Sequence, residues 1–155
     1  MNQPKTEAAK PNILIVDDSL QNLQLLRDLL IQCGYAVTGA PDGPNALMIA
    51  QNKMPDLILL DVLMPGMDGY EVCSQLKIDE RTAAIPVIFL TALDDTENKL
   101  KGFHAGGVDF ITKPFQPEEI AARIETQLNL RNFQKQLEEQ NAQLQVELAA
   151  RKSAE

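Results

Sequence analysis

The chain has 155 residues, of which 45% are hydrophobic, so it can bury the core of one domain of common size. Its formal net charge is −8 and it lacks Trp, which argues against direct binding of DNA or RNA through phosphate contacts or base stacking. No apolar run approaches the length that a membrane span needs, and residues 1–10 are polar, so we expect a disordered tail and no contact with a membrane.

The two cysteines are not arranged like a metal site. Cys33 ends one apolar helical pattern, Cys73 lies within another, and the chain has a single His. A zinc site is therefore not predicted. We expect both cysteines to be reduced, partly buried thiols in a cytoplasmic protein.

Short apolar runs alternate with segments of helical spacing along the chain. The predicted strands are residues 12–16, 35–40, 57–60, 87–90 and 108–112. The predicted helices follow Ser19, span 45–52 and 70–77 after loops that include 41–44, follow Asp94 and Asp95, and begin after Pro117. This alternation predicts an α/β fold, a flavodoxin-like doubly wound five-stranded parallel sheet of order 2-1-3-4-5 with an extended C-terminal helix.

Two of these helices carry apolar residues that predict which side faces the sheet. In the helix after Asp94 and Asp95, Leu100, Phe103 and Ala105 are expected to point inward. In the last helix, the expected inward residues are Ile120, Ile124 and Leu128.

Polar residues follow four of the predicted strands. They are Asp17 with Asp18, then Asp61, Thr91 and Lys113. The carboxyl ends of parallel strands meet at one edge of the sheet, where open α/β folds bind their ligands. The sequence therefore predicts a site at this edge.

Three carboxylates at one edge repel one another and call for a cation. Mg²⁺ takes oxygen ligands and binds through one or two carboxylates with waters and phosphate oxygens. Asp18 and Asp61 could supply side-chain ligands, Asp17 could act through water, and the Leu63 carbonyl lies two residues past Asp61. An ionised Asp61 is also a candidate nucleophile towards a phosphoryl group, with Lys113 and Thr91 to stabilise its oxygens.

Four segments in this order resemble the receiver domain of bacterial two-component response regulators, over residues 11–130. The segments are IVDD at 15–18, LDVLMPGMDG at 60–69, PVIFLTA at 86–92 and DFITKPF at 109–115. Each motif alone would be weak, whereas four in register are specific. The spacings from Asp61 to Thr91 and from Asp61 to Lys113 also match those of the family.

The resemblance implies a role for each residue at this edge. Asp61 is then the acceptor of a phosphoryl group from a phosphohistidine on a sensor kinase or phosphotransfer protein, with Mg²⁺ as cofactor. Asp17 and Asp18 correspond to the Mg²⁺-binding acidic pair, and Thr91 and Lys113 to the residues that contact the phosphoryl group. The remaining implied features are the aromatic switch at Phe110 and a cis peptide bond at Lys113–Pro114.

The C-terminal segment is predicted to be one long helix. Residues 117–155 contain no Gly and no Pro after Pro117, and 39 helical residues would extend about 58 Å. Leu130, Leu137 and Leu144 recur every seven residues as d positions, which places Gln134, Asn141 and Leu148 at a. Residues 131–155 therefore form either a coiled coil that makes a homodimer or a solvated linker helix; we expect this linker to lead towards an output domain.

Two other functions remain open at this stage. One is a Mg²⁺-dependent phosphohydrolase that forms an aspartyl phosphate, but such enzymes usually carry a second Asp two residues after the nucleophile, where Leu63 stands. We therefore expect a phosphoacceptor domain with only self-phosphorylation and slow autodephosphorylation, not an enzyme. The other is a constitutive dimerisation module, against which the full acidic set argues.

Overall fold

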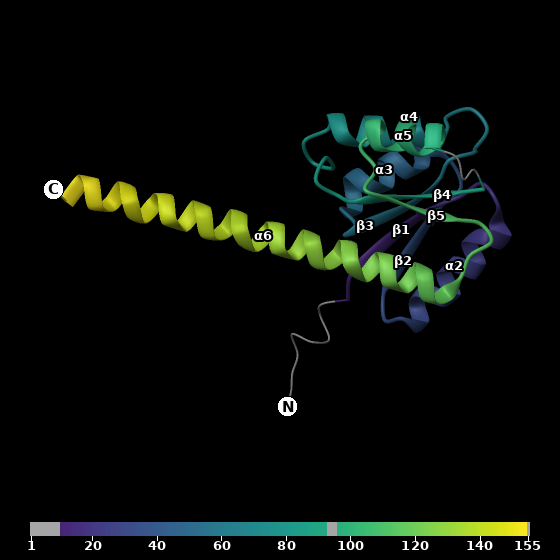
Figure 1. The fold of residues 1–155 in the computed structure, drawn as a ribbon, viewed down its shortest axis with the longest axis horizontal. Helices are drawn as coiled ribbons and strands as arrows, with labels where there is room; N and C mark the ends of the chain where they lie inside the picture. The colour runs from purple at the N-terminus through teal and green to yellow at the C-terminus, as the bar shows by residue number, and fades with distance from the viewer. Residues whose placement is uncertain (1–9, 93–95, 155) are drawn as a thin grey trace.

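The computed structural model describes residues 10–92 and 96–154. Residues 1–9 of the predicted tail, together with Asp94 and Asp95, lie outside the described residues. The sheet is parallel, with the order β2-β1-β3-β4-β5, which confirms the predicted flavodoxin-like topology (Figure 1). Its strands are β1 (Asn12–Val16), β2 (Ala36–Ala40), β3 (Leu57–Asp61), β4 (Val87–Thr91) and β5 (Asp109–Thr112).

Helices cover both faces of the sheet. In Figure 1, α3, α4 and α5 lie on one face, and α2 lies on the other face together with the first part of α6. The helices are α2 (Leu20–Gln32), α3 (Gly43–Lys53), α4 (Gly69–Ile78), α5 (Thr96–Ala105) and α6 (Pro117–Ala154). The doubly wound arrangement is thus as the sequence predicts.

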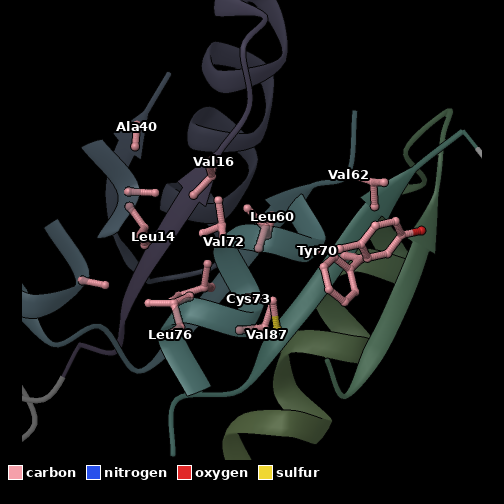
Figure 2. Packing of buried hydrophobic residues seen from close by; sticks show 14 of the residues in the cluster. Leu14, Val16, Ala40, Leu60, Val62, Tyr70, Val72, Cys73, Leu76 and Val87 are labelled. Atoms are coloured by element: carbon pink, nitrogen blue, oxygen red, sulfur yellow. The ribbon is translucent and has the colours of Figure 1, made fainter. Parts of the chain in front are cut away.

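The central strands are buried on both sides, which explains their unbroken apolar sequences. Successive side chains point to opposite faces, so β3 sends Ile58 and Leu60 to the α3–α4 side and Leu57 and Leu59 to the α2–α6 side. Figure 2 shows the first of these two cores, in which Leu60 lies with residues of α4 such as Val72.

Side-chain caps define where three helices begin. Ser19 Oγ accepts a hydrogen bond from the Asn22 N–H at 3.3 Å, as the predicted cap of α2 should. Asp68 caps α4 in a capping box with Glu71. The predicted start of α3 was wrong: Asp42 caps the helix, which begins at Gly43 instead of 45, since proline is tolerated in the first turn.

The prediction for α5 was partly wrong. Leu100 and Phe103 are 52% and 50% exposed, whereas Gly102 is buried against the sheet. A Cβ at Gly102 would lie 2.4 Å from Cζ of Phe110, so the Phe110 ring occupies the space that a side chain on this helix face would need. Ala105 packs against the core, as expected.

The two thiols differ from each other. Cys73 is fully buried, and burial raises its pKa to about 11, so it is an inert core residue. Cys33 is exposed, which corrects the expectation of partial burial, because it lies at the C-cap of α2 beyond the last buried residue, Leu30. Both are free cysteines.

The long helix α6 packs on the sheet only at its beginning. Ile120 and Ile124 are buried and Leu128 is partly buried, as predicted. The side chains of residues 132–153 are all exposed, and the helix extends far from the sheet (Figure 1). Neither α6 nor any other helix in the described part of the chain has the apolar length that crossing a bilayer requires.

Candidate functional site

Three carboxylates gather at the carboxyl edge of the sheet. Asp17 follows β1 and Asp61 ends β3, and these two strands are neighbours. One oxygen from each of Asp17, Asp18 and Asp61 lies within 4.8 Å of the others. Asp17 and Asp61 are buried and Asp18 is exposed, so the cluster opens to solvent on one side.

A lysine from the far strand reaches this cluster. Lys113 follows β5, and its Nζ lies 3.2 Å from Oδ1 of Asp61 and 4.0 Å from Oδ2 of Asp17. The Lys113–Pro114 peptide bond is cis. The structure thus places Lys113 beside Asp61, although 52 residues separate them in the sequence.

Asp17 is held in place by the start of α2. Its Oδ1 accepts a hydrogen bond from the Ser19 N–H at 2.9 Å, and its Oδ2 accepts one from Nδ2 of Asn22 at 3.1 Å. Asn22 was missed in the sequence, where an Asn in the first turn after an acidic pair is the only available signal. These bonds leave Asp17 oriented but still without a full countercharge.

The charges around Asp61 favour its protonated form. Burial is the main cause and repulsion by Asp17 adds to it, so the pKa of Asp61 is raised from 3.8 to about 6 despite the attraction of Lys113. One lysine therefore does not neutralise the cluster. A further cation at this edge would restore the charged form of Asp61.

The donor chemistry of the cluster fits Mg²⁺. The three carboxylates are hard oxygen ligands, and exposed Asp18 leaves room for the waters that Mg²⁺ retains. The side chain of Leu63 is 57% exposed and turned away from the core, and its carbonyl remains a predicted ligand. Asp17, Asp18 and Asp61 are the residues that would hold the ion.

Thr91 ends β4, beside the end of β3. It is 2% exposed, and Leu90 before it pairs with Asp61 in the sheet register. Its position at the edge agrees with the sequence prediction. The hydroxyl of a residue here is suited to contact an oxygen of a group bound at Asp61.

Phe110 belongs to a row of aromatic rings on the α4–α5 side of the sheet. Its ring centroid lies 5.3 Å from Phe89 and 5.3 Å from Phe103, and Phe89 lies 5.4 Å from Tyr70. Phe110 is 7% exposed, so its ring points inward here. The hydroxyl of Tyr70 donates to the Asn98 carbonyl at 3.1 Å and so ties α4 to α5.

Phe89 and Tyr70 were not predicted to lie beside Phe110. Phe89 pairs with Phe110 across the β4–β5 register and stands two residues before Thr91 on the same strand face. The ring of Phe89 thus lies between Phe110 and Tyr70, on the strand that ends in Thr91.

Comparison with known proteins identifies the family. The model of the response regulator receiver domain matches residues 13–125, which is more than half of the chain. The chain belongs to the response regulator receiver domain family. The same receiver segment aligns with the response regulator PleD of Caulobacter vibrioides, with 47% identity over 112 residues.

A second relative of this receiver domain is the DNA-binding dual master transcriptional regulator RpaA of Synechocystis, 46% identical over 114 residues. The alignments cover 72% and 74% of this chain, but 25% of PleD and 47% of RpaA. The chain thus spans less than half the length of these relatives.

Solved structures show the same receiver fold. The chemotaxis protein CheY4 of Vibrio cholerae superposes with a TM-score of 0.74 at 33% identity, covering 76% of this chain and 98% of CheY4. The receiver domain of the Francisella response regulator 1452 gives a TM-score of 0.72 at 33% identity, covering 77% and 98%. About a quarter of this chain therefore has no counterpart in either structure.

Proposed function

We propose that this receiver domain, residues 11–130, accepts a phosphoryl group on Asp61 from the phosphohistidine of a sensor kinase or phosphotransfer protein. One observation carries the proposal: the acidic cluster of Asp17, Asp18 and Asp61 meets the Nζ of Lys113, 3.2 Å from Asp61, at the carboxyl edge of the sheet. The domain acts as a phosphoacceptor and not as an enzyme with a separate substrate.

The proposed transfer forms one bond and breaks one. An oxygen of the Asp61 carboxylate attacks the phosphorus, an O–P bond forms, and the P–N bond to the donor histidine breaks with its electron pair left on nitrogen. Thr91 ends β4 and Lys113 follows the neighbouring strand β5, and there the two side chains would contact phosphoryl oxygens.

Mg²⁺ is the proposed cofactor. When bound by Asp17, Asp18 and Asp61, with the Leu63 carbonyl, it supplies positive charge for the carboxylates and for the phosphoryl oxygens. Asp17 is already oriented for this by Ser19 and Asn22.

Thr91 and Phe110 form the proposed switch. A phosphoryl group on Asp61 would attract Thr91 and so stabilise the inward position of the Phe110 ring, which packs on Phe89 and on Phe103 of α5. Phe110 lies on β5, which α6 follows, so the change would reach the long helix. Residues 131–155 are the proposed linker that carries it to a dimer or an output domain.

A phosphohydrolase is the less favoured function. The side chain of Leu63 is apolar and 57% exposed, and it offers no group to position an attacking water near Asp61. We propose slow autodephosphorylation for the same reason. The net charge of −8 supports a receiver that does not itself bind nucleic acid.

Replacing the acceptor tests the site. In Asp61→Asn we expect complete loss of the acid-stable, hydroxylamine-sensitive phosphoryl label that acetyl phosphate with Mg²⁺ should give, measured by intact mass, because an amide is not a nucleophile. Asp68→Asn is the matched control, since an Asn at this helix cap preserves the cap and lies outside the cluster. Undiminished labelling of Asp61→Asn would refute the assignment.

The proposed homodimer through α6 has its own test. Light scattering of the chain should give a dimer mass, and Mg²⁺ with beryllofluoride should change the dimer population of the native protein but not of Asp61→Asn. A dimer that ignores beryllofluoride would favour the constitutive dimerisation module. A monomer in every condition would mean that α6 is a solvated linker.

A further inference from the structure

A groove of about 500 Å³ lies where α6 leaves the receiver. One wall is formed by the receiver residues Ala84, Pro86 and Val108, and the other by Gln127, Leu130 and Gln134 of α6. Leu130 is 50% exposed and Val108 is 40% exposed, so the groove presents apolar surface to solvent.

Two cationic side chains donate hydrogen bonds to the loop that lines this groove. Arg131 of α6 donates a hydrogen bond from Nη1 to the Ala84 carbonyl. Lys77 of α4 donates from Nζ to the carbonyls of Ala83 and Ile85, at 2.9 and 2.6 Å. Three consecutive carbonyls of one loop therefore accept hydrogen bonds from these cations, and the bond from Arg131 ties α6 to the loop.

The helix residues in the groove belong to the heptad pattern of α6. Leu130 is the first of the d positions that continue with Leu137 and Leu144. Gln127 and Gln134 stand seven residues apart at a. A neighbouring hollow of about 360 Å³, lined by Ala84, Arg131, Gln134 and Leu137 among others, continues the groove along the same helix face.

The part of this pattern that lies beyond the receiver is short. From Leu137 to Leu148 it has four layers, one of them the polar Asn141, which amounts to less than two heptads. Coiled coils are recognised over three to four heptads or more, and a polar a residue costs stability. A dimer built on these layers alone would be weak, so the layers at the root of α6 are needed.

We propose that the groove receives the root of α6 from a second copy of this chain, so that Val108 and Pro86 of the receiver join the dimer seam. This inference rests on the proposed homodimer and adds the receiver surface to it. Because Arg131 ties the helix to the loop, a movement of the loop would shift the root of the seam. A change at Val108, the residue before β5, would then act directly on the interface.

The charges along the seam favour a parallel, in-register pair. With Leu144 at d, Glu147 occupies g and Lys152 occupies e of the next heptad. A parallel in-register dimer sets Glu147 of one helix opposite Lys152 of the other, twice. Asn141 then meets Asn141 across the seam, the arrangement that specifies two strands.

A charge placed in the groove tests the proposal without touching the coil. We expect Val108→Glu to raise the dimer dissociation constant of the full chain at least tenfold, measured by sedimentation with and without Mg²⁺ and beryllofluoride. Leu25→Glu, at a 55% exposed position on α2, is the control and should leave it unchanged. A matched thermal transition would show that Val108→Glu still folds.

Disulfide trapping gives an independent measure. In a Cys33→Ser background, Leu130→Cys and Leu144→Cys should both form crosslinked homodimers under mild oxidation. Trapping at Leu144 but not at Leu130, with a Val108→Glu dimer of normal strength, would overturn the groove while leaving the coil dimer intact. A monomer throughout would overturn both, and phosphoryl labelling of Asp61 would still report on the receiver function separately.

Discussion

Gly69→Ala is expected to destabilise the fold by about 2 kcal/mol or more, since overpacking of well-packed sites costs 1–3 kcal/mol. A Cβ at Gly69 would lie 2.3 Å from the Asp61 carbonyl oxygen and 2.9 Å from Cα of Val62. Both are backbone atoms, which cannot turn aside as a side chain can. The N–H of Gly69 also donates to the Val62 carbonyl at 2.9 Å, so the start of α4 is held against the end of β3.

The same substitution should weaken phosphorylation, because the backbone that must shift belongs to Asp61. Urea unfolding measures the first effect, and the rate of labelling by acetyl phosphate measures the second. Gly39→Ala is the control: its Cβ would meet only Leu23 side-chain atoms, the nearest at 3.6 Å, so we expect no loss of stability. Equal stability of Gly69→Ala and Gly39→Ala would show that the contact with Asp61 relaxes freely.

The sheet could be predicted from sequence because its strands are buried on both faces. A run such as Leu57–Asp61 is apolar without interruption until its last residue, and that last residue marks the edge. Helix ends were less certain because they depend on single caps. Asp42, for example, serves as a cap three residues before the predicted start of α3.

The orientation of α5 could not be predicted, because it depends on a neighbour distant in sequence. Phe110 comes from β5 and fills the space below Gly102, which leaves Phe103 on the flank of the helix. The spacing of apolar residues in a helix predicts which face is buried, but it does not show that the Phe110 ring from another strand already fills the space beneath that face. The strand register that brings Phe89 beside Phe110 was likewise invisible in the sequence.

The charged residues of the site were easier to predict than the hydrogen bonds that hold the loops and helices elsewhere in the domain. Asp17, Asp61 and Lys113 each follow a strand, so the topology alone brings them together. The hydrogen bonds from Lys77 and Arg131 to the carbonyls of residues 83–85 depend on the loop conformation and on the position of α6. No spacing in the sequence encodes that geometry.

Asp61→Asn is expected to stabilise the metal-free fold at pH 7 by about 1–3 kcal/mol. The pKa of Asp61 is raised to about 6 in the fold, against 3.8 as the ordinary value, mainly by burial and by Asp17. A shift of this size corresponds to about 3 kcal/mol, a net value that already includes the attraction of Lys113. The folded state binds more protons than the unfolded state between these two values.

The sign follows from that proton balance. An acid with a raised pKa loses stabilisation as the pH rises through the window from about 4 to 6, so the native protein should become less stable there. Asp61→Asn should lack this decline, whereas Asp68→Asn should retain it. Unfolding by urea in EDTA across this pH range measures the difference.

With Mg²⁺ present, the native protein should become more stable than Asp61→Asn. If Mg²⁺ binds the cluster of Asp17, Asp18 and Asp61 in the folded state only, as proposed, the native protein should gain stability with the logarithm of the Mg²⁺ concentration above the dissociation constant. Asp61→Asn should gain much less from the same Mg²⁺. If the native protein gained no stability from millimolar Mg²⁺, the three carboxylates would not form a metal site, and the excess negative charge at the sheet edge would have to be balanced by Lys113 alone.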